Sequence, residues 1–461
     1  MPDKQKQLVQ QVFKLLEARD KAALQKLFKK QRTSDIAEVV ELVDTEEKRV
    51  IFDVLDKPVA AEILEKVEEA TRAELFELLA EHEIHTLISE LDLDDAADLL
   101  AELPEEIRRK VLKSIAPPDS EEIKELMSYS EDSAGGIMDP VLISVPAGAT
   151  VTEVVNKIRA AEIEEDFYSV YVVDDTGKFL GDVRIRLLLT SPENTRLNDL
   201  IDPNTIYVNV EDDQEKVRNI FSKNDLIVVP VLDENHNLIG RITADRVIEV
   251  AEEEAVEDLF AMAGTNPDEL ESFSAFRAAR IRMTWLLPCL IGTAITAVVL
   301  TFFNKKFTLQ NLPLIYTGAI AFVPMIAAIS GNAGLQTSAI VVSGLATGHL
   351  AALKLSQVVS REVRIAVLVA LSCAVTGGST CAILLKMHTS DAAIEAARLV
   401  FAVGSAMFAA IMVATTLGLF LPFLFRRIGI DPAISSGPLV TTANDSISVA
   451  IYMTLTLFLA S

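Results

Sequence analysis

The sequence predicts a multidomain membrane protein with four parts: an all-α superhelical N-terminal domain, a tandem α/β module, an acidic connecting helix and an all-α transmembrane domain of five helices. Three observations predict this fold class. Apolar residues recur at helical spacing over residues 5–127, a strand–helix pattern occurs twice between 138 and 250, and long apolar runs follow Met283. A chain of 461 residues is also too long for one core. We place the domains at 1–130, 137–250, 251–276 and 277–461.

Charge is divided unevenly along the chain. Residues 283–461 hold nine of the 42 Lys and Arg residues and five of the 67 Asp and Glu residues. Residues 1–282 therefore hold 33 basic and 62 acidic residues, a net charge of −29. Such a soluble half repels nucleic acid and attracts multivalent cations. The three cysteines lie in apolar runs and the first thirty residues lack a signal-peptide core, so a cytoplasmic soluble half is expected.

Three similar helical segments begin near Ile36, Val59 and Ala96. Short helices repeated in this way stack into a superhelix, in which each repeat buries its apolar stripe against the next. His82 and His85 lie three residues apart, whereas zinc peptidases use two histidines four apart on one helix face. No other catalytic motif stands out, so we do not expect an enzyme.

The α/β region contains two copies of one pattern. A hydrophobic strand, an acidic turn before glycine and a closing strand occur at Val170–Gly181 and again at Val228–Gly240, and Arg241-Ile242-Thr243-Ala244-Asp245 ends the second copy. This order resembles a tandem of CBS domains. In that family the closing Thr and Asp can hold an adenine nucleotide. Thr243 and Asp245 match these two positions, so the resemblance implies a nucleotide site there. The first copy has Arg184-Ile185-Arg186-Leu187 instead, so at most one site is implied, with ATP as a regulatory ligand; a pair that acts only as a mechanical lever is the alternative.

The connecting helix is strongly acidic, with five acids among residues 252–258. These groups repel one another unless a counter-ion lies between them. Acids of the α/β module could close round the same ions, and oxygen ligands suit divalent cations such as Mg²⁺. The neighbouring acids are Asp212, Asp213, Glu215, Asp225, Asp245 and Glu249.

Hydropathy after Met283 requires a membrane, and each apolar run is long enough to cross it. Eight Lys and Arg residues flank the spans on the side of the N-terminus and four on the other, which places the N-terminal domains in the cytoplasm and the C-terminus outside. The predicted spans are 283–303, 312–342, 363–386, 396–425 and 434–459.

Asp445 lies in the middle of the last apolar run, close to mid-membrane. A charge at that depth costs about 2.5–3.5 kcal/mol on insertion scales, so it is expected to face a partner or a water-filled path. The alternative is an Asp that only helps packing. In the second span Pro324 can kink the helix, and the polar run Ser330–Thr337 that follows offers oxygens to the waters of a hydrated ion.

These parts, in this order, resemble the MgtE family of magnesium channels over essentially the whole chain. The motifs are Pro324 with Gly331-Asn332-x-Gly334-x-Gln336, and Asp431-Pro432-Ala433 with Pro438–Thr442 and Asp445. The resemblance implies a homodimer in the cell membrane, with a pore on its two-fold axis and a cytoplasmic Mg²⁺ sensor. The implied pore ligands are Asp445, Asn332, Gly331, Asp431 and Thr441; the implied sensor acids are Asp213, Glu215, Asp225, Asp245, Glu249, Glu254, Glu257 and Asp258.

Two residues depart from the family pattern. Arg246 stands where relatives can have an acid, which puts in doubt a sensor ion that bridges to the N-terminal domain, and Gly437 stands where a polar residue can occur near the pore. The expected function is Mg²⁺ uptake through a selective channel that cytoplasmic Mg²⁺ closes. The alternative is a sodium-coupled exporter of divalent cations with regulatory CBS domains.

Overall fold

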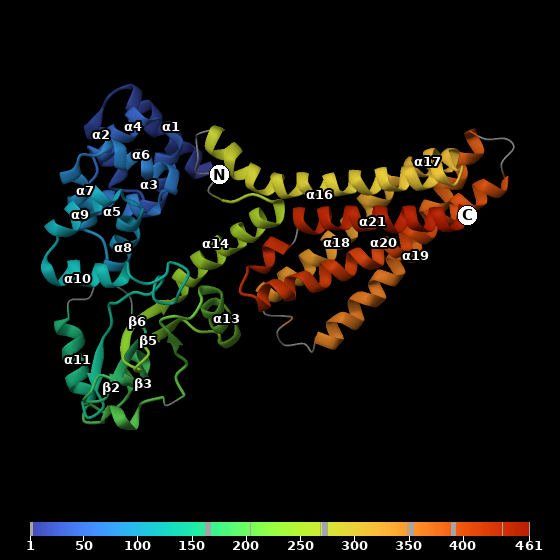
Figure 1. Ribbon diagram of the computed structural model, residues 1–461. Helices are drawn as coiled ribbons and strands as arrows, with labels where there is room; N and C mark the ends of the chain where they lie inside the picture. The colour runs from blue at the N-terminus through green and yellow to red at the C-terminus, as the bar shows by residue number, and fades with distance from the viewer. Residues whose placement is uncertain are drawn as a thin grey trace. The chain divides into compact units, whose positions relative to one another are not determined.

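A computed structural model describes most of the chain, and its contacts divide the chain into two compact units, residues 1–251 and residues 252–461 (Figure 1). Each unit is described by itself. The described residues are 3–161, 167–202, 204–267, 269, 275–347, 350, 355–388, 393–435 and 437–460.

The first unit begins with ten short helices in the described part of residues 3–126. Most of them pack against the helix two places along the chain, as α3 does against α5, α5 against α7 and α8 against α10. This packing buries one stripe of each helix, for example Ile63 and Leu64 of α5 and Leu99 and Leu100 of α8. The all-α prediction is confirmed for this region, and the superhelical form stays a prediction. The helices are α1 (Asp3–Glu17), α2 (Lys21–Phe28), α3 (Thr33–Leu42), α4 (Thr45–Phe52), α5 (Lys57–Lys66), α6 (Glu69–Leu78), α7 (Glu81–Ile88), α8 (Leu93–Glu102), α9 (Glu105–Ser114) and α10 (Pro117–Leu126).

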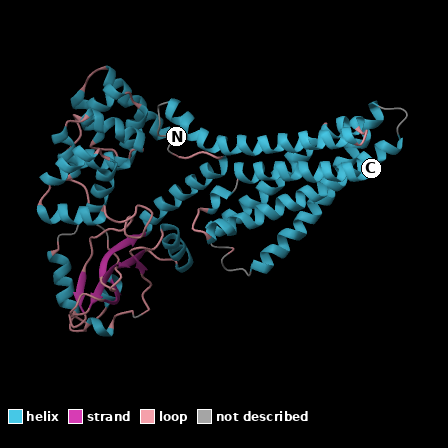
Figure 2. Ribbon diagram, viewed as in Figure 1, coloured by secondary structure: helices cyan, strands magenta, loops and turns pink. Residues whose placement is uncertain are grey.

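All strands of the described residues lie between α10 and the helix that follows the α/β region (Figure 2). They form two sheets of three strands, in the orders β1-β2-β3 and β4-β5-β6. The elements are β1 (Ser144–Pro146), α11 (Val151–Ala160), β2 (Ser169–Val173), β3 (Phe179–Arg184), α12 (Ile185–Thr190), η1 (Leu197–Asp199), β4 (Val208–Asn209), α13 (Gln214–Asn224), β5 (Val228–Leu232) and β6 (Leu238–Thr243).

The two sheets repeat each other in detail. In each, the first strand pairs parallel with the second and the second pairs antiparallel with the third. Even the irregularity recurs, because the register shifts at Val172/Val173 in one sheet and at Val231/Leu232 in the other. The predicted tandem α/β module is therefore present.

A single helix, α14 (Ala244–Ala263), continues directly from β6 and runs from the first unit into the second. The sequence places the connecting helix at 251–276, whereas the helix begins at Ala244 and ends before Gly264, which has a φ of +76°. No proline or glycine interrupts residues 244–263, so nothing breaks the helix before that point.

The rest of the second unit is helical. Its elements are α16 (Ala275–Leu309), α17 (Pro313–Ile320), α18 (Val323–Ala346), α19 (Leu355–His388), α20 (Ala393–Arg427), η2 (Pro432–Ser435) and α21 (Pro438–Ala460). Among the described residues, four helical stretches are long and apolar enough to cross a membrane: 275–309, 315–346, 356–386 and 397–427. The 23-residue α21 is not among these four, so the prediction of five spans stays a prediction.

Helices α18, α20 and α21 pack against one another, α19 packs on α20, and α16 packs on α21. A Cβ added at Gly418 of α20 would overlap the carbonyl oxygen of Gly334 in α18, so a glycine there lets the two backbones meet. The second span is broken where the sequence predicts a kink: α17 ends at Ile320 and α18 begins at Val323, which places Pro324 in the first turn of a helix, where proline is tolerated.

Candidate functional site

Three of the predicted pore residues lie together where α18 faces α21. A Cβ added at Gly331 would have Asp445 Oδ1, Thr441 Cγ2 and Asn444 Nδ2 as its nearest neighbours, each at 3.8 Å. Asp445 itself is only half-buried in the single chain. A carboxylate in this position, on a helix packed among membrane-length helices, needs a cation or water beside it.

The other two predicted pore residues have different surroundings. Asn332 is exposed, and so is Gln336 one turn later on the same face of α18. Asp431 is exposed in the turn before α21, where its Oδ1 accepts a hydrogen bond of 2.8 Å from the Ala433 N–H. This bond starts the short helix η2, so Asp431 has a local structural role in the turn before α21.

The entry to α21 depends on Gly437. Its φ is +64°, and a Cβ at this position would overlap the carbonyl oxygen of Met262 near the end of α14. Close by, Ala261, Val342 and Ala433 form a small buried cluster, so the C-terminal end of α14 packs against the segment that leads into α21. The departure noted at Gly437 therefore has a steric reason.

Gly437→Ala is expected to destabilise the protein more than Gly429→Ala, when thermal unfolding of the purified full chain is followed in detergent. Both glycines have a positive φ, +64° and +75°, so both variants bear the left-handed backbone cost of about 1–2 kcal/mol. Only Gly437 also meets Met262, because nothing lies within 4 Å of a Cβ at Gly429. Equal losses of stability would show that the contact with α14 is unimportant.

Five predicted sensor acids belong to the first unit. Asp213 caps the start of α13, where its Oδ1 accepts from the Glu215 N–H at 2.9 Å, and Asp225 ends that helix with a φ of 51°. The 11-residue helix α13 lies between these two carboxylates, and the twelve steps from Asp213 to Asp225 separate their backbones by roughly 18 Å, too far to ligate one ion. Asp245 and Glu249 lie one turn apart on α14, both exposed, and suit a shared cation better.

Sequence reasoning missed a group of acids on α8. Arg246 of α14 lies between the helical domain and the α/β module: its Nη2 is 2.7 Å from Asp98 Oδ2, and its Nη1 is 3.2 Å from Glu249 Oε2. The guanidinium group of Arg246 therefore occupies the place where a sensor ion that bridges to the N-terminal domain would lie. The only signal in the sequence was the acid-rich start of α8, because Asp98 and Arg246 are 148 residues apart.

Burial makes the α8 carboxyls hard to ionise. Burial, and then the charge of Asp139, raises the pKa of Asp94 to about 7. Burial, followed by the charges of Asp94 and Glu65, raises the pKa of Asp95 to about 8. The charge of Arg246 lowers the pKa of Asp94 and of Asp95 without offsetting their burial, so this contact favours protons or additional cations near neutral pH.

The remaining sensor acids, Glu254, Glu257 and Asp258, lie on the part of α14 that belongs to the second unit. Glu254 and Asp258 are half-buried and one turn apart, whereas Glu257 is exposed. In the described part of the chain no three His, Cys, Asp or Glu side chains already converge as a metal cage. Ligation through water, which Mg²⁺ keeps readily, does not require such convergence.

The two candidate nucleotide residues lie at the junction of β6 and α14, where Thr243 ends the strand and Asp245 stands in the first helical turn. Thr243 is partly buried and Asp245 is exposed. The corresponding junction of the first copy, β3 to α12, carries Arg184 and Arg186.

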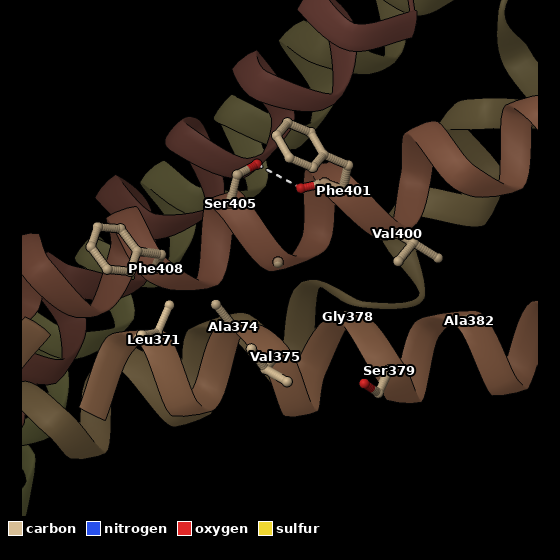
Figure 3. A pocket seen from close by; sticks show the side chains of 11 residues that line it. Leu371, Ala374, Val375, Gly378, Ser379, Ala382, Val400, Phe401, Ser405 and Phe408 are labelled. Carbon is tan, nitrogen blue, oxygen red and sulfur yellow. Dashed lines mark hydrogen bonds between the residues drawn. The ribbon is translucent and has the colours of Figure 1, made fainter. Parts of the chain in front are cut away.

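A groove of about 470 Å³ lies between α19 and α20 (Figure 3). Its lining is almost wholly apolar, including Leu371, Val375 and Phe408, and the Ser405 hydroxyl donates to the Phe401 carbonyl oxygen of its own helix at 2.7 Å. None of the predicted site residues lines it. Its chemistry suits lipid chains or helix packing and offers little to an ion.

A paired α/β module continues through an acidic helix into a unit with four membrane-length helical stretches, and a half-buried carboxylate lies on the helix α21 packed among them. This combination is typical of a membrane transport protein with regulatory soluble domains. Comparison with known families gives the particular family. The chain belongs to the MgtE family: the divalent cation transporter domain matches residues 323–455, the MgtE intracellular N domain matches 31–132, and the CBS domain matches 134–192 and 197–253.

Similar whole proteins carry the same family name. The magnesium transporter MgtE of Thermus thermophilus is 32% identical over 353 residues, 75% of this chain and 74% of that protein. The magnesium transporter MgtE of Bacillus subtilis is 30% identical over 342 residues, 74% of this chain and 72% of that protein. A crystal structure of the cytosolic domain of the Mg²⁺ channel MgtE in complex with ATP aligns with a TM-score of 0.50 and 31% identity, covering 52% of this chain and 99% of that one.

Proposed function

We propose that the protein is a homodimeric Mg²⁺-selective channel for magnesium uptake through the cell membrane, closed by Mg²⁺ on the cytoplasmic side. The observation that carries the proposal is the meeting of Asp445 with Gly331 and Thr441 between α18 and α21. The family and its magnesium-transporting relatives support the choice of ion.

Two copies of this surface would form the pore. Asp445, Asn332 and Gln336 are partly or fully exposed in the single chain, which is unfavourable for polar groups on membrane helices unless water or a second subunit lies beside them. Paired carboxylates with amide oxygens nearby suit a hydrated octahedral ion, because Mg²⁺ dehydrates reluctantly.

Regulation follows from the acids of each unit. Without Mg²⁺, the carboxylates on α14 and on the CBS pair repel their neighbours, and the soluble domains separate. Bound Mg²⁺ neutralises these carboxylates. It shifts the equilibrium between the open and closed states because it binds the closed state more tightly than the open state. The acids of the first unit and those of the second are two separate groups of ligands in this scheme.

Magnesium is expected to protect the contact of α8 with the CBS pair more strongly at about pH 8 than at about pH 6. The folded-state pKa values of Asp94 and Asp95 lie above the ordinary 3.8, so the stability that these groups contribute is complete below pH 3.8 and is lost as the pH rises through about 7 to 8. A divalent ion then takes the place of the lost protons.

Limited proteolysis of the full chain, with and without millimolar Mg²⁺, measures this effect through cleavage between α10 and β1. The double variant Asp94→Asn/Asp95→Asn removes both titrations and should be cleaved equally at the two pH values. Equal Mg²⁺ protection of the unmodified protein at both pH values would count against the scheme.

ATP is proposed as a regulatory ligand of the second CBS domain, at Thr243 and Asp245. The similar cytosolic domain solved with ATP supports this assignment. The β3–α12 junction of the first CBS domain carries Arg184 and Arg186 and has no acid that corresponds to Asp245, so we propose one nucleotide per chain.

The decisive experiment for the function is Mg²⁺ flux into liposomes that contain the purified full chain, with and without a sodium gradient. A channel conducts down the Mg²⁺ gradient alone. Flux that stops when sodium is equal on both sides would favour the alternative, a sodium-coupled exporter.

A further inference from the structure

Three fully buried polar side chains form a hydrogen-bonded cluster between α18 and α21. Ser330, Asn444 and Ser448 each have 0% of their surface exposed. The Asn444 Nδ2 donates to Ser330 Oγ at 2.8 Å, the Ser448 Oγ donates to Asn444 Oδ1 at 2.9 Å, and the two serine oxygens are 3.0 Å apart.

The amide of Asn444 has a partner for both of its ends. The Ser330 hydroxyl donates to the Ile326 carbonyl oxygen of its own helix at 2.7 Å, which leaves its oxygen free to accept from Asn444. Asn444 therefore uses its amide N–H toward α18 and its carbonyl oxygen toward Ser448. No other rotation of α21 preserves this set, because a turn or slide of the helix leaves the amide without partners in an apolar interior.

The cluster fixes the direction of Asp445. Successive residues of an α-helix are about 100° apart, so holding Asn444 toward Ser330 sets where the next side chain points. Neighbouring residues meet on both helices: Ser330 contacts Asn444, and Gly331 lies beside Asp445. We infer that Asn444 is a positioning residue for ion recognition, which aims the Asp445 carboxylate at the ion path through its bonds to Ser330 and Ser448. This inference rests on the proposed function of Asp445.

Asn444→Leu tests it, since leucine keeps the number and branching of the side-chain heavy atoms and removes both hydrogen bonds. In liposomes with equal amounts of inserted protein, we expect the half-saturating Mg²⁺ concentration to rise roughly three- to tenfold, the range that the loss of one interhelical hydrogen bond allows. Discrimination of Mg²⁺ against Ca²⁺ should fall at the same time, because the carboxylates are no longer held at one spacing. Ser330→Ala, a smaller change on the other helix, should shift both measurements in the same direction and decides the question if the leucine variant does not insert.

Tyr452→Phe is the matched control. It removes another buried hydrogen bond of α21, from the Tyr452 hydroxyl to the Ala319 carbonyl oxygen at 2.8 Å, two turns away from Asp445. It should lower thermal stability and leave the half-saturating concentration and the selectivity unchanged.

The outcomes separate this inference from the proposed function. If Asp445→Asn transports Mg²⁺ normally, the proposed function is wrong. If Asp445→Asn is inactive while Asn444→Leu and Ser330→Ala keep the original half-saturation and selectivity, the cluster only holds the helices together and the positioning role is wrong.

Discussion

Asp445→Asn is expected to abolish Mg²⁺ uptake while the protein still reaches the membrane. Asparagine has nearly the same shape, so packing beside Gly331 and Thr441 is kept and only the charge is lost. A hydrated dication in a membrane interior needs a compensating negative charge, and no neutral amide supplies one. Growth of a magnesium-dependent host and Mg²⁺ flux in liposomes both measure the effect.

The control for that experiment is Thr454→Ala on the same helix. Thr454 is exposed, and its hydroxyl donates to the Ala450 carbonyl oxygen of α21 at 2.7 Å. This variant should transport as the unmodified protein does. Normal uptake by Asp445→Asn would remove the basis for a pore at this position.

The second large effect is expected from the combined variant Glu254→Gln, Glu257→Gln, Asp258→Asn. These changes remove charge from α14 without shortening its side chains, so fewer Mg²⁺ ions bind and the closed state is less favoured. The cytoplasmic Mg²⁺ concentration that halves the current should rise roughly tenfold or more, since several ions act together.

Patch recording of the channel with Mg²⁺ varied on the cytoplasmic face measures this shift. Glu121, Glu122 and Glu125 on α10 are exposed acids, and changing all three to glutamine removes the same charge elsewhere. Closure that is unchanged in the α14 variant, or shifted equally in the α10 control, would contradict a specific role of α14.

Local patterns explain which parts of the fold could be predicted. Strands β2 and β5 follow their apolar runs to within a residue, and α11, which precedes β2, begins at the capping box of Thr150 and Glu153. The start of α14 was placed too late because acidity was taken as the boundary, whereas helix-breaking residues set it. The sequence predicts a kink at Pro324, and the structure has a break at the same place, because a new helix, α18, begins at Val323.

The contents of the candidate site were only partly predictable. The grouping of Asp445, Gly331 and Thr441 came from the family resemblance, because one sequence does not say which helix faces which. The Arg246–Asp98 pair and the Asn444 cluster join residues 148 and 114 positions apart, and only the packed structure brings them together. Nothing in the sequence shows that the acids on α8 are buried, and this burial raises the pKa values of Asp94 and Asp95.

The unbroken course of α14 has a mechanical consequence. Its 20 residues form a rod of about 30 Å that starts at the closing strand of one sheet and ends where Gly264 meets Pro438 at the head of α21. A continuous helix resists both bending and twisting, so a shift of the last turns of α14 within the second unit is passed directly to Pro438, seven residues before Asp445.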